Sequence, residues 1–186
     1  MPTVAPARLA RLAALLLFAA CSSESAPGTA DAPAAAPDSP AAEDLDATAA
    51  DFECVLHWDQ VGPYRVTNKL GHDAKSVALS PTGGTFPVGT ILQIVPTEAM
   101  VKRRVGFDAA SNDWEFFALD VSASGTTITT RGTTNVVNRF GGNCLSCHAK
   151  AMPQFDLVCG TTHGCDALPV SEQTLVDLQN SDPRCP

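Results

Sequence analysis

The stretch Cys144-Leu145-Ser146-Cys147-His148 constrains this chain more than any other part of its sequence. Residues three apart lie on the same face of a helix, so the thiols of Cys144 and Cys147 can reach one edge of a single planar group. His148 follows Cys144 by about one turn, where its imidazole can bind a metal beneath that group. Cys-x-x-Cys-His is the attachment signature of haem c. The stretch therefore predicts one covalent haem c, held by both thiols, with His148 as the proximal iron ligand.

The residues around this stretch favour a short helix. Asn143 is a suitable N-cap, Gly141-Gly142 interrupts the chain before it, and Pro153 limits its continuation. The helix is the geometry in which both thiols face the same way, so local structure and proposed chemistry agree.

Two other uses of the same cysteines stay open from the sequence. A zinc site could combine Cys144 and Cys147 with Cys159 and either His163 or Cys165, because thiolate and imidazole suit tetrahedral zinc. Two thiols at this spacing could instead form a dithiol redox motif. The compartment in which the chain folds helps to decide among these readings.

Residues 1–20 have the composition of a secretory signal. Arg8 and Arg11 accompany a short apolar run, Leu12 to Ala20, that is too short to span a bilayer. Phe18-Ala19-Ala20-Cys21 resembles the cleavage box of bacterial lipoproteins, so Cys21 is expected to become the lipidated first residue. The chain is therefore predicted to leave the cytoplasm.

The expected location is the bacterial cell envelope, lipid-anchored and facing the periplasm. Ser22 after Cys21 gives no inner-membrane retention signal, which favours the outer membrane by analogy. Haem c is attached in that compartment, and unligated cysteines tend to oxidise there. Export thus favours haem over zinc and over a cytosolic dithiol motif.

Residues 21–52 are predicted to be an acidic, disordered tether, because Ala, Pro, Ser, Thr and Gly offer little apolar surface to bury. The net charge of −8 resides between Ser22 and Glu53, where there is no Lys or Arg. In the remaining residues positive and negative charges nearly balance, which argues against nucleic acid as a partner. Residues 53–186 are long enough for one domain with a single core.

The predicted fold class is α+β, predominantly an antiparallel β-meander with the short haem-binding helix and a C-terminal helix. Apolar and β-branched patterns predict strands over residues 88–95, 100–107, 114–121 and 126–131. Residues 96–99 read as a turn, and a helix is expected over 171–180. Residues 54–85 show only turn signals, at 61–64 and 80–84.

Four cysteines remain once Cys21 and the haem pair are set aside: Cys54, Cys159, Cys165 and Cys185. In an oxidising compartment they predict two disulfides, with three connectivities to choose from. The local choice joins Cys159 to Cys165 and leaves Cys54 with Cys185 to tie the two ends of the domain together. Zinc bound by Cys159 and His163 is the rival use.

Four segments follow one another in a recognisable order: residues 86–92 (FPVGTIL), 114–117 (WEFF), 144–148 (CLSCH) and 155–156 (FD). This pattern resembles the cytochrome P-460 family and its relative cytochrome c′-beta, over roughly residues 86–158. The resemblance implies an antiparallel sheet whose face forms the distal wall of a haem pocket. The tail, residues 159–186, departs from those relatives.

In P-460 enzymes a lysine on the strand after Gly-Thr is linked to the porphyrin, and the enzymes oxidise hydroxylamine. The register from Gly89-Thr90 places Ile94 at that position, and an aliphatic side chain cannot form the link. Lys102 is the nearest other lysine, but it is expected on the next strand. The chain therefore looks more like the c′-beta branch, which binds small gases in an apolar pocket.

The sixth iron ligand decides between two roles. The side chains that could supply it are Met100, His57, His72, Met152 and His163. Met100 leads because it begins the strand next to the one that carries Ile94, whereas Met152 follows His148 by one turn and belongs on the proximal side. A filled sixth position favours electron transfer, and an open apolar pocket favours a neutral diatomic gas.

The sequence thus predicts an exported monohaem c-type cytochrome that acts in electron transfer or in binding NO or CO. A redox partner protein, the membrane and a second copy of the chain are the further partners considered. One alternative is a haem enzyme that oxidises a small nitrogen compound such as hydroxylamine. The other is a structural zinc-binding lipoprotein. No catalytic residue is singled out.

Overall fold

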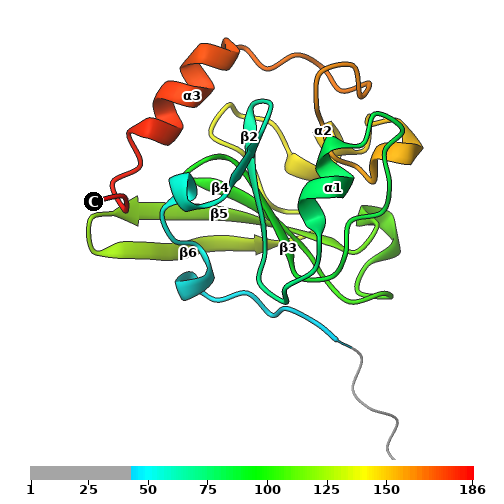
Figure 1. Cartoon of the computed structure of the whole chain (residues 1–186), viewed down its shortest axis with the longest axis horizontal. Helices are drawn as coiled ribbons and strands as arrows, with labels where there is room; N and C mark the ends of the chain where they lie inside the picture. Colours follow the sequence, from blue (N-terminus) through cyan, green and yellow to red (C-terminus); the bar gives the residue numbers. More distant parts are fainter. Residues whose placement is uncertain (1–42) are drawn as a thin grey trace, which may run out of the picture. The chain divides into compact units, whose positions relative to one another are not determined.

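The computed structural model describes residues 43–186, which are built around one six-stranded antiparallel sheet. Each strand pairs with the next in the chain, as a simple meander (Figure 1). The strands are β1 (Asp59–Val61), β2 (Tyr64–Asn68), β3 (Thr90–Val95), β4 (Glu98–Lys102), β5 (Trp114–Ser122) and β6 (Gly125–Gly132). The predicted α+β class and antiparallel meander are confirmed.

Three α-helices accompany the sheet: α1 (Ala74–Leu79), α2 (Cys144–His148) and α3 (Glu172–Asn180). Asn143 caps α2 by accepting a hydrogen bond from Ser146 N, and Ser171 caps α3 by accepting one from Thr174 N. Both helices and the Asn143 cap were predicted. Within residues 43–186 no helix combines the length and the apolar character needed to cross a membrane.

Four short 3₁₀ helices complete the described elements: η1 (Ala49–Asp51), η2 (Val55–His57), η3 (Ala109–Ser111) and η4 (Pro153–Phe155). Strands β1 and β2 and helix α1 were missed, because residues 54–85 gave only turn signals. The turn expected at 61–64 does join β1 to β2, with Gly62 at a φ of 53°.

The strand predicted over residues 100–107 is wrong beyond Lys102. The chain turns there, with Phe107 N donating to Arg104 O, and Val105 is 84 % exposed. The turn predicted over residues 96–99 is shorter than expected, because Glu98 and Ala99 already pair with β5. Strand β4 therefore begins two residues earlier and ends five residues earlier than predicted.

Alternating side chains give the sheet two apolar faces. The helix face carries Leu92, Met100 and Phe116, which cluster with Cys144 and Val158. The strap face carries Ile91, Val101 and Phe117, which cluster with Ala47, Phe52 and Trp58. Figure 1 shows α1 and α2 on one side of the sheet and the segment that starts at residue 43 on the other.

Residues 43–52, here called the strap, correct the predicted tether of residues 21–52. Ala47 and Phe52 are buried, and Asp44 accepts hydrogen bonds from Arg103 and from Arg104 N at 2.9–3.0 Å. The Arg103 guanidinium holds the pKa of Asp44 below its usual value. These ten residues therefore belong to the domain. The predicted signal, the predicted lipidation site Cys21 and the rest of the predicted tether lie outside the described residues.

Both predicted disulfides are present: Cys54 is bonded to Cys185, and Cys159 to Cys165. The first pair is 131 residues apart and the second only 6. Loop-closure entropy then gives about 5 kcal/mol for Cys54–Cys185 and about 2 kcal/mol for Cys159–Cys165. We expect C54A/C185A to lower the free energy of unfolding by about twice as much as C159A/C165A, measured by urea denaturation. Equal losses would contradict chain closure as the source.

Candidate functional site

A cavity of about 110 Å³ lies between the helix face of the sheet and α2. This volume is enough for several water molecules. Its wall combines sheet residues, all three residues of α2 that were predicted to bind haem, and the segment after η4: Tyr64, Leu92, Ile94, Met100, Phe116, Cys144, Cys147, His148, Val158 and Leu168, among others. The structure thus brings the predicted haem-binding residues to one largely apolar cavity.

The two cysteines of α2 are free thiols, although the other four described cysteines are paired. Cys144 is buried and Cys147 is half-buried. Burial, with the nearby Glu98 and Cys147, raises the pKa of Cys144 to about 12. A dithiol redox motif requires a readily formed thiolate, so this environment argues against that use. Such an environment suits thiols that take part in a reaction other than dithiol redox exchange.

His148 is oriented by a single hydrogen bond. Its Nδ1 lies 2.7 Å from the Leu157 carbonyl oxygen. A carbonyl can only accept, so Nδ1 carries the hydrogen and Nε2 keeps its lone pair. Burial lowers the pKa of His148, against the opposing effect of the Leu157 carbonyl, and so favours the neutral ring. A neutral imidazole whose second nitrogen donates to a carbonyl is the usual arrangement of a metal-binding histidine.

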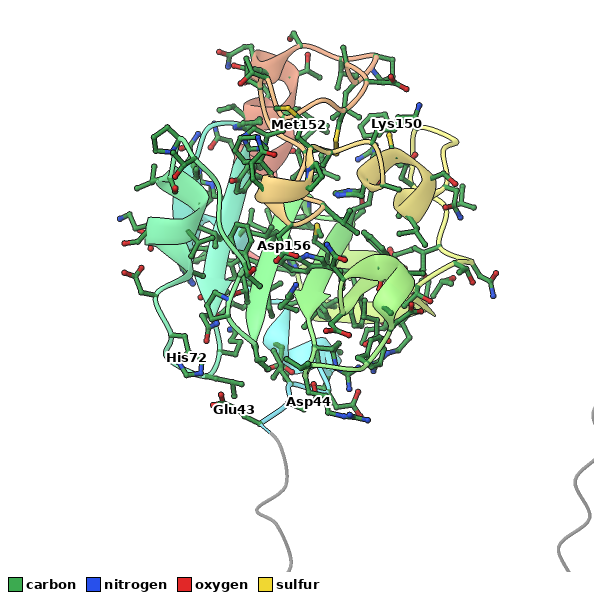
Figure 2. The ribbon with its side chains drawn as sticks, turned by 90° about the vertical axis from the view of Figure 1, so that its right-hand side faces the viewer. Glu43, Asp44, His72, Lys150, Met152 and Asp156 are labelled. Carbon is green, nitrogen blue, oxygen red and sulfur yellow. A yellow bond between two sulfur atoms is a disulfide. The ribbon has the colours of Figure 1, made fainter. Side chains whose placement is uncertain are left out.

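The Leu157 carbonyl is placed by the turn after η4. Asp156 and Leu157 both have left-handed backbone, with φ of 51° and 60°. Both carboxylate oxygens of Asp156 lie 2.8 Å from Lys102 Nζ, in a pair that is nearly inaccessible to solvent. Figure 2 shows Asp156 in the interior, between Met152 and Asp44 in that view. The sequence marked Asp156 only through the family resemblance and gave it no role.

Of the five side chains considered as sixth ligand, only Met100 lines the cavity. It is 5 % exposed and pairs on the sheet with Leu92 and Phe116. The others lie elsewhere: His57 is exposed, His72 pairs with Glu43 at 2.8 Å, Met152 is 38 % exposed, and His163 stacks on Phe155. Figure 2 shows Met152 and His72 towards opposite ends of the view.

The zinc ligands proposed from the sequence are not free to act together. Cys159 and Cys165 are bonded to each other, and His163 Nδ1 lies 2.8 Å from the Val158 carbonyl oxygen. Among residues 43–186, the group of metal-binding side chains whose ligand atoms come together is Cys54, Asp182 and Cys185. The sulfur atoms of Cys54 and Cys185 are already joined in a disulfide. The zinc alternative therefore lacks its ligand set.

Sequence reasoning missed several polar cavity residues, among them Tyr64 and Glu98. Burial raises the pKa of Tyr64 to about 12, so its phenol is neutral. Burial also raises the pKa of Glu98, which accepts a 2.6 Å hydrogen bond from Arg139 N. The alternation of Tyr64 and Val66 was the signal that could have revealed strand β2 and, with it, Tyr64.

Compared with protein-family models, with curated proteins and with solved structures, the chain has no match in any of the three. The likeness to P-460 sequences therefore stays a prediction from four short segments. What supports a function is the set of residues around the cavity.

Proposed function

We propose that this chain is an exported monohaem c-type cytochrome, of P-460/c′-beta type, that binds a small neutral gas such as NO or CO. One observation carries the proposal: His148 Nδ1 lies 2.7 Å from the Leu157 carbonyl oxygen, which leaves Nε2 as the nitrogen for a metal, and the free thiols of Cys144 and Cys147 are on the same helix. All three residues line the same apolar cavity. These are the donors that haem c requires, and the residues present fit it.

Each cysteine would contribute one covalent bond. The sulfur of Cys144 or Cys147 would join one carbon of a vinyl group and the thiol hydrogen would go to the other, so no oxidant would be required. His148 Nε2 would supply the lone pair for iron, and the hydrogen bond to the Leu157 carbonyl would hold the imidazole in place. Bound haem c supplies an iron that can exchange one electron and hold a small gas.

The sheet side of the cavity favours a neutral gas. Leu92, Ile94 and Phe116 line it with apolar side chains, which disfavour water and charged ligands. Met100 is the one residue here that supports the second candidate, electron transfer, because its thioether could fill the sixth position. Whether Met100 binds the iron therefore decides between gas binding and electron transfer.

The hydroxylamine-oxidising alternative has less support. Ile94 lines the cavity, and within residues 43–186 no lysine is among the lining residues. Lys102 is engaged by Asp156 and Asn112 O instead. An amine able to cross-link a porphyrin is therefore lacking from the described wall.

We also propose that the protein is lipid-anchored through Cys21 and faces the periplasm, with the outer membrane favoured. The two disulfides support an oxidising compartment. On the basis of the cytochrome proposal, we also propose that the protein has a redox partner protein and that it associates with itself.

The test is the absorption spectrum of the full chain, produced in a host that attaches haem c. We expect a haem spectrum whose reduced form shifts when CO is added, in the wild type and in M100L alike, because the cavity wall around Met100 is apolar. If CO leaves the reduced spectrum of the wild type unchanged but shifts that of M100L, Met100 is the sixth ligand. The protein would then be an electron carrier. Absence of haem absorbance would contradict the proposal.

A further inference from the structure

We propose that the buried ion pair between Lys102 and Asp156 is the device that positions His148. It does so by holding the Leu157 carbonyl against the Nδ1–H of the imidazole. The inference rests on the proposed function, because His148 matters in this way only as an iron ligand. Lys102 and Asp156 are then positioning residues, separated from the cavity by one turn of backbone.

The ion pair has a single well-defined geometry. Lys102 Nζ lies 2.8 Å from each carboxylate oxygen of Asp156 and 2.6 Å from Asn112 O, so all three of its protons have partners. Each side chain is 6 % exposed. The ammonium also lies 5.1 Å from the centre of the Trp114 ring. Strand β4 thereby fixes the place of the Asp156 carboxylate.

Asp156 has two further hydrogen bonds, one through its side chain and one through its main chain. Its Oδ2 accepts a 2.9 Å hydrogen bond from Phe86 N, and its carbonyl oxygen accepts a 2.7 Å hydrogen bond from Trp114 Nε1. Both partners are buried. With side chain and carbonyl both fixed, the peptide plane that leads into Leu157 has little freedom.

The backbone at this point needs such support. Asp156 and Leu157 are consecutive non-glycine residues in the left-handed region, with φ of 51° and 60°. Such conformations cost free energy and persist where the surroundings over-determine them. Once the Lys102–Asp156 pair is broken, the turn can relax, and the Leu157 carbonyl can leave its 2.7 Å contact with His148.

This contact bears on the chemistry of His148. A carbonyl that accepts from Nδ1–H makes Nε2 a better electron donor. A stronger donor stabilises oxidised iron relative to reduced iron, so the hydrogen bond lowers the reduction potential. Its loss is expected to raise that potential and to free the ring to rotate.

A matched control is available at the C-terminal end of the chain. Asp182 pairs with Arg184 at 2.7 Å, with side chains 0 % and 3 % exposed, and also accepts from Val55 N. Neither residue lines the cavity. D182N therefore removes a buried carboxylate of the same kind without touching the Leu157 carbonyl.

The experiment compares the haem-loaded full chain with D156N, K102M/D156N and D182N. In D156N we expect about a tenfold change in the equilibrium constant for reduction, an upward shift of about 59 mV for one electron. We also expect the Nδ1–H proton resonance of His148 to lose its hydrogen-bonded position. K102M/D156N leaves no unpaired buried charge, so it serves as a second test if D156N folds poorly. It should show the same change in potential and in the His148 proton resonance. D182N should lower the melting temperature and leave both signals in place.

Two results would overturn the inference: an unchanged potential in haem-loaded D156N and K102M/D156N, or an equal shift in D182N. Either leaves the cytochrome assignment intact, because the haem is present. A wild-type chain that takes up no haem would instead refute the proposed function, and the inference with it.

Discussion

The double variant C144A/C147A is expected to lose all covalently bound haem. These two residues supply the free thiols of the described chain, since the other four cysteines of residues 43–186 are paired in disulfides. Without a thiol there is no sulfur to add to a vinyl group. Haem held by His148 alone would dissociate when the protein is denatured. The measurement is the haem absorbance of acid-denatured protein, with the mass of the intact chain.

The variant S146A is the matched control for this experiment. Ser146 lies between the two cysteines on α2 and is exposed, so its removal changes the helix surface and no thiol. It should keep its haem after denaturation. Haem that stays bound to denatured C144A/C147A would show that attachment uses other residues. This result would contradict the proposal that Cys144 and Cys147 hold haem c.

A chain that begins at residue 53 is expected not to fold cooperatively, whereas one that begins at residue 40 should fold like the full chain. Removal of the strap uncovers Ile91, Val101 and Phe117 on the strap face. Loss of Phe52 alone is comparable to a buried Phe→Ala change, about 3–5 kcal/mol. The whole domain has roughly 5–15 kcal/mol to lose.

The strap also neutralises buried charge. Arg103 is 7 % exposed and is shared by Glu115 and Asp44. Arg131 bonds both Glu115 and Asp46. Without the strap two guanidinium groups would share one carboxylate, which leaves excess buried charge and adds to the destabilisation.

Thermal unfolding followed by circular dichroism measures this effect. In the full chain, D44A/F52A should lower the melting temperature strongly, and E43Q should not, because Glu43 only pairs with His72 at the surface. Equal melting temperatures for the chains that begin at residues 40 and 53 would show that the strap is dispensable.

The acidic N-terminal segment illustrates how composition can mislead. Its residues Asp44 and Asp46 were assigned to a solvated tether because no cation lies near them in the sequence. Their partners Arg103 and Arg131 are distant along the chain, with Asp44 and Arg103 separated by 59 residues. Composition has no access to such a pairing, since it depends on where the sheet places each arginine.

The sequence by itself determined the features that depend on near neighbours. Helix α2 and its Asn143 cap follow from spacing and capping chemistry, and β5 and β6 follow from aromatic and β-branched residues. The two disulfides follow from the predicted export and from the four remaining cysteines, once the two nearest in sequence are paired. Each of these depends on contacts within a few residues or on simple counting.

Only the tertiary structure decided what surrounds His148. The Leu157 carbonyl, the left-handed turn at Asp156 and the Lys102 ammonium meet because Asp156, the residue that ends η4, pairs with Lys102 of β4 across 54 residues of sequence. The strap and the cavity wall arise in the same way, from segments that are adjacent only after the sheet forms. Such contacts are decided by which surfaces can be buried together and by which charges they leave to be paired.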